Sequence, residues 1–406
     1  MSEIVVTGIG VISSLGIGRN DFWEGVRTGR SGIKQITHFD TTSLRSNVAG
    51  WIDDFKPERF LPPRTYRRMS RVSRMAVAAS IDALSDSGVN LEEIDRERVA
   101  IIMGTAYGSS SKVDEFFKGR LKDGPRGAHP FTFPETVPNA PASHIAIFHG
   151  ITGPNSTFCQ NEISSETAIM YARNILLQNL VDVVLVGGAD ELSAMQYSCY
   201  DAVRALNRIT VSEGETVQPL RGGGLVLGEG AGMLVMERSE FARSRNARIY
   251  GCLKSGIITG GAVAINRYDA EGIQTARAVT SAMEDAGVGP DDIDQIDISA
   301  NYSRELDTME AAMLRRIFGK KEDEIAVSPL KYRIGDFGGS GIVRAAAVLL
   351  SMHAGVPLPA VTTDILIDGA CTDLQWNIGA SGSVLVTMMT SNTFGGGSSS
   401  LIFTMA

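Results

Sequence analysis

One turn in the middle of the chain combines residue types that could do chemistry. A Gly-Pro pair at 153–154 opens it, a short β-prone run follows, and small polar residues lead into a helix expected to reach about Leu180. The turn contains a carboxylate, Glu162, and a thiol, Cys159. A strand that turns sharply into a helix places one side chain at the helix N-terminus, where backbone N–H groups and the helix dipole favour an anion. Enzymes use such turns to hold a nucleophile.

The elements that must position this turn read as alternating strands and helices. Residues 4–10 read as a buried strand that ends in glycines, and residues 181–190 form a near-continuous apolar strand. Strands of that kind are covered on both faces. Residues 64–84 show helical spacing with a stripe of small apolar side chains. The sequence therefore predicts an α/β protein.

Two passages about two hundred residues apart repeat the same pattern. Residues 79–104 and residues 280–298 each read as a helix, a glycine that ends it, an acidic turn and a strand. A duplication at that separation indicates two similar α/β halves rather than a short-period solenoid. The second half is expected to start near Ile249, and no Gly/Ser-rich or Pro-rich linker precedes it. The halves are therefore expected to share one core.

Composition excludes several classes of function. A formal net charge of −8 argues against a general nucleic-acid binder, because that affinity depends on neutralising phosphates. No run of 18 apolar residues appears, so no membrane span is expected. The start lacks the pattern of a signal peptide, and the four cysteines show no metal-ligand spacing. We therefore expect no metal and no cofactor, and a reducing cytoplasm as the location.

The central turn resembles the active-site turn of β-ketoacyl synthases, in which Gly-Pro precedes a strand, Thr-Ala-Cys-x-Ser-Gly, and Ala-Ile in the helix. Counting from Gly153-Pro154, or back from Ala168-Ile169, places the nucleophile's seat on Glu162 and not on Cys159. Residues 224–233 match the family's Gly-Phe-Val-x-Gly-Glu-Gly-Ala-Gly, and their glycines are expected to serve close backbone packing. The resemblance implies a thiolase-like fold with two duplicated α/β halves, residues 1–248 and 249–406, in a layered αβαβα arrangement.

The family's other catalytic seats are also changed. The first catalytic His falls on Ser299 or Asn301, which the loop length leaves open, and the second falls on Asp336, while the family's Lys is kept as Lys331. None of the chain's five histidines lies in a motif position. They are expected at the surface or in packing roles: His38, His129, His144, His149 and His353. A carboxylate cannot form the thioester that condensation requires, and groups that act as a unit are not restored one at a time.

A ketosynthase frame without its Cys and both His resembles the chain length factor, the ketosynthase β-subunit of type II polyketide synthases. That resemblance implies a heterodimer with an active ketosynthase α-subunit, work on an acyl carrier protein, and control of polyketide length through a tunnel at the interface. The usual residue in the nucleophile's seat of a chain length factor is Gln, whereas this chain has Glu162. The residues expected to shape or gate the tunnel are aromatic: Phe116, Phe117, Phe131, Phe133 and Phe394.

Simpler interpretations accompany several of these residues. Glu162 could be an ordinary helix-capping residue, Cys159 is expected in a buried strand, and any single Phe could belong to the core. Asp336 is expected to pair with a nearby cation such as Arg333 or Arg344.

Two other functions remain open. One is an enzyme that uses Glu162 and Asp336 as paired carboxylates for decarboxylation or thioester hydrolysis. The other is a homodimeric scaffold in fatty-acid synthesis.

Overall fold

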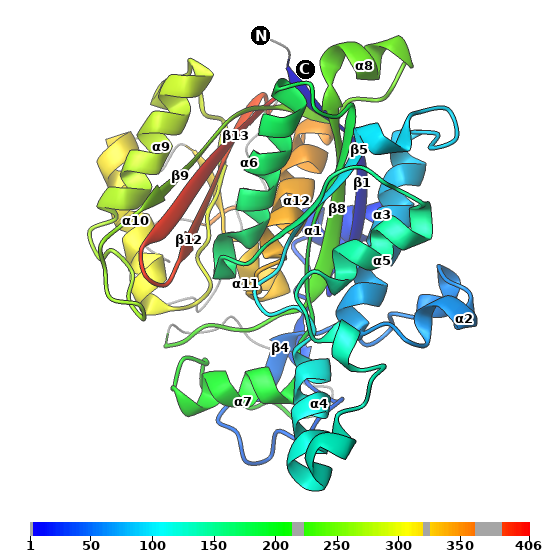
Figure 1. Ribbon diagram of the computed structural model, residues 1–406. Helices are drawn as coiled ribbons and strands as arrows, with labels where there is room; N and C mark the ends of the chain where they lie inside the picture. Colours follow the sequence, from blue (N-terminus) through cyan, green and yellow to red (C-terminus); the bar gives the residue numbers. More distant parts are fainter. Residues whose placement is uncertain (1–2, 213–222, 320–324, 362–383) are drawn as a thin grey trace.

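The computed structural model describes residues 3–212, 223–319, 325–361 and 384–406, which are arranged in five alternating layers of helices and strands (Figure 1). Helices α6 (Ser164–Leu177) and α12 (Ser340–Ala354) form the central layer and pack against strands on both sides. Two pairs of helices cover the outer faces: α3 (Arg71–Ser87) with α5 (Ala140–His149), and α9 (Ile273–Ala286) with α10 (Arg304–Phe318). The αβαβα arrangement expected from the sequence is confirmed.

Most of the described strands form one large sheet in the order β11-β10-β12-β13-β9-β1-β8-β7-β5-β6, with β2 paired to β1. Its members are β1 (Ile4–Ser13), β2 (Gly16–Ile17), β5 (Val99–Gly104), β6 (Asn155–Phe158), β7 (Val183–Asp190), β8 (Gly230–Arg238), β9 (Gly251–Gly260), β10 (Gln295–Asp297), β11 (Ala326–Ser328), β12 (Val386–Thr393) and β13 (Gly397–Thr404). The two halves meet where β1 pairs with β9, Val5 opposite Cys252. A boundary at residues 248 and 249 stays a prediction.

The central helix α12 is buried along almost its whole length, because its buried side chains are small or apolar apart from Arg344, whose charge is paired with Asp297. A helix that is apolar all round belongs in the interior of a layered fold. Glycines just before and within β8 allow α11 (Lys331–Ile334) and α12 to approach closely. A Cβ at Gly228 would lie 2.3 Å from the carbonyl oxygen of Ile334, and one at Gly232 would lie 2.4 Å from the Ile342 side chain. The packing role expected for these glycines is confirmed.

The predicted duplication corresponds to two matching passages of structure. Helix α3 ends at Gly88 (φ 67°) and α9 ends at Gly287 (φ 71°), and each is followed by a 3₁₀ turn and then a strand that pairs in parallel, β5 or β10. Glycine suits both helix ends because it adopts the left-handed conformation without a steric penalty. The helix that ends in glycine, the turn and the strand were therefore correctly predicted in both halves.

Two predicted helix boundaries were wrong. The helix expected over residues 64–84 is divided into α2 (Pro63–Tyr66) and α3, because the Ser70 side chain accepts a hydrogen bond from the Ser73 N–H (3.3 Å) and starts a new helix. The helix expected to reach Leu180 ends at Leu177. The remaining elements are α1 (Arg19–Arg27), α4 (Ser110–Asp123), α7 (Ala194–Ala202), α8 (Ser239–Ser244), α11 (Lys331–Ile334), and the small sheet of β3 (Ile33–Gln35) and β4 (Val48–Gly50).

Candidate functional site

The central turn places Glu162 in the interior, just before helix α6. Strand β6 pairs in parallel with β5, and a 3₁₀ turn over Asn161–Ile163 then leads into the helix. Ser164 fixes the turn, because its hydroxyl accepts from the Gln160 N–H (2.8 Å) and lies 2.7 Å from the Asn161 carbonyl oxygen. Asn161 has φ 49°, a left-handed conformation that Asn tolerates better than most residues. The Glu162 residue is only 7% exposed.

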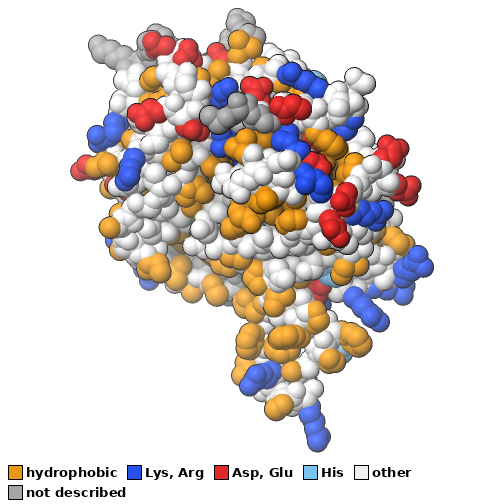
Figure 2. Space-filling model, turned by 45° about the horizontal axis from the view of Figure 1, so that its top comes forward, with side chains coloured by type: hydrophobic (Ala, Val, Ile, Leu, Met, Phe, Trp, Pro, Cys, Tyr) orange, Lys and Arg blue, Asp and Glu red, His pale blue; other side chains and the backbone are white. Residues whose placement is uncertain are grey.

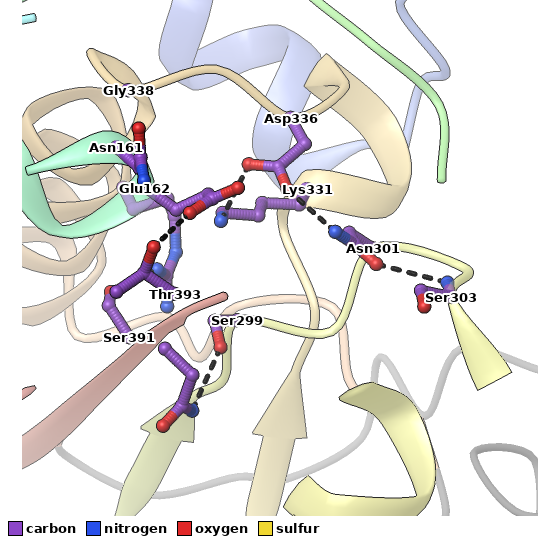
Figure 3. Close-up of polar contacts among 12 residues, drawn as sticks. Asn161, Glu162, Ser299, Asn301, Ser303, Lys331, Asp336, Gly338, Ser391 and Thr393 are labelled. Atoms are coloured by element: carbon purple, nitrogen blue, oxygen red, sulfur yellow. Dashed lines mark hydrogen bonds and ion pairs between the residues drawn. The ribbon is translucent and has the colours of Figure 1, made fainter. Parts of the chain in front are cut away.

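Four segments of the chain meet around Glu162 and Asp336, as Figure 3 shows. Thr393, at the end of β12, donates its hydroxyl to Glu162 Oε2. The Lys331 ammonium forms an ion pair with Asp336 Oδ1 at 2.7 Å, although the geometry is not that of a hydrogen bond. The Asn301 amide donates to Asp336 Oδ2 (2.6 Å). We call Glu162, Asn301, Lys331, Asp336 and Thr393 the polar cluster.

The polar cluster holds two carboxylates and one ammonium with almost no exposure to solvent. Burial and, after it, the nearby charge of Asp336 raise the pKa of Glu162 to about 7, against the Thr393 hydrogen bond and the Lys331 charge, which lower it. A carboxyl group that titrates near neutral pH is the electrostatic consequence of removing it from water beside a like charge. Within the polar cluster, Lys331 is the only cation.

The structure distinguishes the two residues that the sequence left open for the first His seat. Asn301 belongs to the polar cluster, and its side-chain oxygen accepts from the Ser303 N–H (3.0 Å). Ser299 points elsewhere: its hydroxyl donates to Glu310 (2.5 Å) and accepts from the Asn392 amide (3.1 Å). Asn301 therefore lies where it can contact Asp336, and Ser299 does not.

Asp336 pairs with a cation, as expected, but that cation is not Arg344. Arg344 is fully buried and binds Asp297 Oδ2 through Nε (2.6 Å), with Glu166 3.8 Å from its Nη1. Asp336 pairs instead with Lys331, because α11 carries that lysine directly into the cluster. The expectation that a nearby cation pairs with Asp336 is confirmed, but the cation is Lys331, and Arg344, one of the two examples given, pairs with Asp297 instead.

Cys159 was also predicted wrongly. It lies one residue beyond the end of β6 and is exposed, because β6 is the last strand of the sheet and its outer edge is unpaired in the described part of the chain. Burial of part of the side chain raises the pKa of the thiol. The thiolate that a nucleophile requires is therefore disfavoured, in keeping with a cysteine outside the seat.

No histidine takes part in the polar cluster. His38 stacks on Trp51 with ring centroids 3.2 Å apart, His144 pairs with Glu135, and His149 lies 2.8 Å from the Ser80 hydroxyl. These contacts are the packing roles expected from the sequence. Among the described residues, no group of three or more His, Cys, Asp or Glu side chains could hold a metal ion.

The aromatic residues predicted to gate a tunnel lie in two places. Phe117, Phe131 and Phe133 are exposed on a segment that projects from the body and includes α4, and Phe116 lies between Phe117 and Phe133 with ring centroids 5.8 Å from each. Figure 2 shows hydrophobic side chains gathered over this projection. We call it the arm (residues 110–137). The alternative that the exposed three are core residues was wrong, whereas Phe394 packs beside Tyr268, with centroids 4.7 Å apart.

A small cavity borders Glu162 and Asp336 and adds residues that the sequence did not single out. It measures about 10 Å³, roughly the space of one water molecule. Tyr107, Gln196 and Tyr200 line it together with the two carboxylates. Thr393 was also missed, although it directly precedes Phe394, one of the aromatic residues expected to gate a tunnel. Nothing in the spacing of the three lining residues indicated that they meet.

No helix in the described ranges is both long and apolar enough to cross a bilayer. The family model for the β-ketoacyl synthase N-terminal domain matches residues 1–242, and the model for the C-terminal domain matches residues 250–364. The 3-oxoacyl-(acyl-carrier-protein) synthase 2 of Coxiella burnetii is 28% identical over 404 residues, which cover 98% of each chain.

Two solved structures resemble the whole chain. The ishigamide ketosynthase/chain length factor has a TM-score of 0.87 at 26% identity, over 100% of this chain and 99% of that one. A β-ketoacyl synthase from Burkholderia phymatum STM815 has a TM-score of 0.86 at 25% identity, over 100% of both chains. The thiolase-like α/β fold is therefore confirmed.

Proposed function

The chain belongs to the β-ketoacyl synthase family, and from that premise we propose that it is a non-condensing subunit of the chain length factor type. In this proposal it pairs with an active ketosynthase, meets an acyl carrier protein only through the resulting complex, and works in the cytoplasm. The observation that carries the proposal is the polar cluster: a carboxylate fills the nucleophile's seat, and an amide and a second carboxylate stand near it.

Condensation needs groups that the polar cluster does not supply. The reaction transfers an acyl chain to a thiolate and then stabilises an enolate and an oxyanion through positioned donors. Glu162 cannot form a thioester, and Asp336, once ionised, has no proton to donate. Lys331 is held against Asp336 and so is already engaged. The cluster therefore supports a structural role for these residues.

The surface around β6 supports pairing with another chain of the same fold. An open edge strand presents unpaired backbone groups that a second strand can complete. Exposed apolar side chains flank that edge, among them Ile147, Phe148 and Tyr171, and the arm adds the exposed rings of Phe117, Phe131 and Phe133. Obligate heterodimers bury apolar surface of this kind. We therefore place the partner ketosynthase against β6 and the arm.

The arm also offers a means of limiting the length of the product. A growing chain that meets a filled pocket must displace side chains, and such overpacking costs about 1–3 kcal/mol. That cost lowers the rate of one further extension by roughly 5- to 150-fold, because 1.4 kcal/mol corresponds to a factor of ten. Bulk alone could then set a preferred length.

Replacing Phe116, Phe117 or Phe133 with Ala is expected to lengthen the polyketide made by the heterodimer, since each change removes a ring from the proposed end of the tunnel. The measurement is product mass after co-expression with the partner ketosynthase and its carrier protein. Phe55→Ala, in the core beside α3, controls for loss of stability and should lower yield without changing length. Unchanged lengths in all three arm variants would remove these rings from the gate.

One observation favours a second function. Glu162 titrates near neutral pH beside a cavity, as a general acid or base would, so decarboxylation or thioester hydrolysis deserves a direct assay. We expect the purified chain to show no turnover of malonyl or acyl thioesters, because the cavity admits only about one water molecule. Turnover that disappears in Glu162→Gln would favour the enzyme instead. A stable homodimer without any partner would favour the fatty-acid scaffold.

A further inference from the structure

Two tyrosines lie at the outer side of the cavity beside Glu162. Tyr107 follows β5, Tyr200 belongs to α7, and their hydroxyl oxygens are 2.7 Å apart, within a hydrogen bond. Their rings meet edge to face with centroids 6.3 Å apart. Among the residues that line the cavity, Tyr107 and Asn161 are exposed, Ala106 and Tyr200 are half-buried, and the rest are buried. Solvent can therefore reach the cavity only past this tyrosine pair and its neighbours.

Both tyrosines are held by contacts that do not depend on a ligand. The fully buried carboxylate of Asp190 accepts from the Tyr107 N–H (3.0 Å), the Thr105 hydroxyl (2.8 Å) and the Gly339 N–H (2.8 Å). These bonds tie the segment that carries Tyr107 to the start of α12. Tyr200 lies in α7, whose first turn is capped by the Ser193 side chain accepting from the Gln196 N–H (3.2 Å). The pair is therefore pre-organised in its closed arrangement.

The cavity beneath the pair is polar and small. Gln196 Oε1 is buried and has no hydrogen-bond partner among the described residues, whereas Asp336 Oδ1 has the Lys331 ammonium 2.7 Å away. Buried acceptors are costly unless a donor reaches them, and a polar space of this size suits one water molecule. An acyl chain offers no donor and would need the rings to move apart.

We propose that the hydrogen-bonded pair of Tyr107 and Tyr200 closes this subunit's own pocket, so that the space beside Glu162 takes water and excludes an acyl chain. The purpose of the closure rests on the proposed function: with this pocket shut, acyl groups are confined to the active sites of the partner. The closure itself depends only on the two rings and their hydroxyl groups.

The test uses a thiol placed beneath the pair as a probe of access. Glu162→Cys is made in a Cys159→Ser background, because Cys159 is exposed and lies on the same stretch of chain. The full-length protein, with any partner that co-purifies, is treated with N-ethylmaleimide, and the modification at position 162 is followed by peptide mass spectrometry. We expect slow labelling with both tyrosines present and at least tenfold faster labelling in Tyr107→Ala/Tyr200→Ala.

Two further variants separate closure from loss of packing. Tyr107→Phe/Tyr200→Phe keeps the rings and removes the hydrogen bond, so it should speed labelling less than the double Ala variant. Ile273→Ala removes an apolar side chain of similar exposure (46% against 41% for Tyr107) at the start of α9, outside the surface proposed for the partner, and should leave the rate unchanged. If the double Ala variant does not fold, Tyr107→Ala alone gives the same readout. Equal labelling rates with and without the two rings would overturn this proposal. The proposed function is tested separately, by the lengths of the products, and would not be decided by the labelling rates.

Discussion

Lys331→Met is expected to lower the free energy of unfolding by about 3–5 kcal/mol, because it leaves a buried carboxylate without its cation. The Lys331 side chain is fully buried, and that of Asp336 is 4% exposed. Met preserves the length and the apolar stem of lysine, so little of the effect comes from lost packing. The measurement is chemical denaturation at neutral pH. An unchanged slope of the free energy of unfolding against denaturant concentration would show that the variant and the wild type expose the same surface on unfolding.

The chain supplies a matched control and a rescue for this change. Lys118 lies 2.7 Å from Asp114, the same distance as in the buried pair, but its side chain is 74% exposed. Lys118→Met should cost less than about 1 kcal/mol, because exposed ion pairs contribute little. Adding Asp336→Asn to Lys331→Met removes the orphaned charge and keeps an acceptor for Asn301, so it should recover part of the loss. If Lys331→Met lowered the free energy of unfolding no more than Lys118→Met does, Lys331 would not be the counter-charge of the polar cluster.

The sequence predicted the helices, strands and turns of this protein better than the side-chain contacts in its interior. Strands buried on both faces, helix-ending glycines such as Gly88 and Gly287, and close-packed glycines such as Gly228 are local signals, and each was found where it was expected. The position of Glu162 before a helix was also predictable, because the turn is encoded within about fifteen residues.

The partners of that carboxylate were not predictable in the same way. Thr393 and Glu162 are 231 residues apart in the chain. Asp336 pairs with Lys331 rather than Arg344 because of where α11 lies in the fold, and no local sequence pattern determines that position. The tyrosine pair illustrates the same limit, since Tyr107 and Tyr200 are 93 residues apart and only the packing of α7 brings them together. The exposure of Cys159 depends on β6 being the last strand of the sheet, which is a property of the whole topology.

Glu162→Gln is expected to stabilise the protein above pH 7 and to remove a pH dependence of stability. Gln is also the usual residue in this seat of the family that the chain resembles. The pKa of Glu162 is about 7 in the folded chain against an ordinary value of 4.5. Between these two values the folded chain holds a proton that the unfolded chain has lost. The free energy of unfolding therefore falls as pH rises through this window and levels off above pH 7.

The size of the effect follows from the same two pKa values. A difference of this size corresponds to roughly 3 kcal/mol, since one pKa unit is about 1.4 kcal/mol. The difference between wild type and Glu162→Gln should thus be small near pH 4.5 and reach up to about 3 kcal/mol by pH 8, because Gln does not titrate and its oxygen can still accept from Thr393. The measurement is denaturant unfolding of both proteins from pH 4.5 to 8.

Glu115→Gln controls for the loss of any carboxylate. Glu115 accepts a hydrogen bond from Lys112, which lowers its pKa below the ordinary value of 4.5. Glu115→Gln should therefore leave a nearly flat difference from wild type over most of the range, with a slope of the opposite sign and of less than about 1 kcal/mol only near and below pH 4.5. Parallel pH profiles for wild type and Glu162→Gln would mean that Glu162 is ionised throughout this range. Lys331 would then have to neutralise both carboxylates, and Lys331→Met would become the more costly change at high pH.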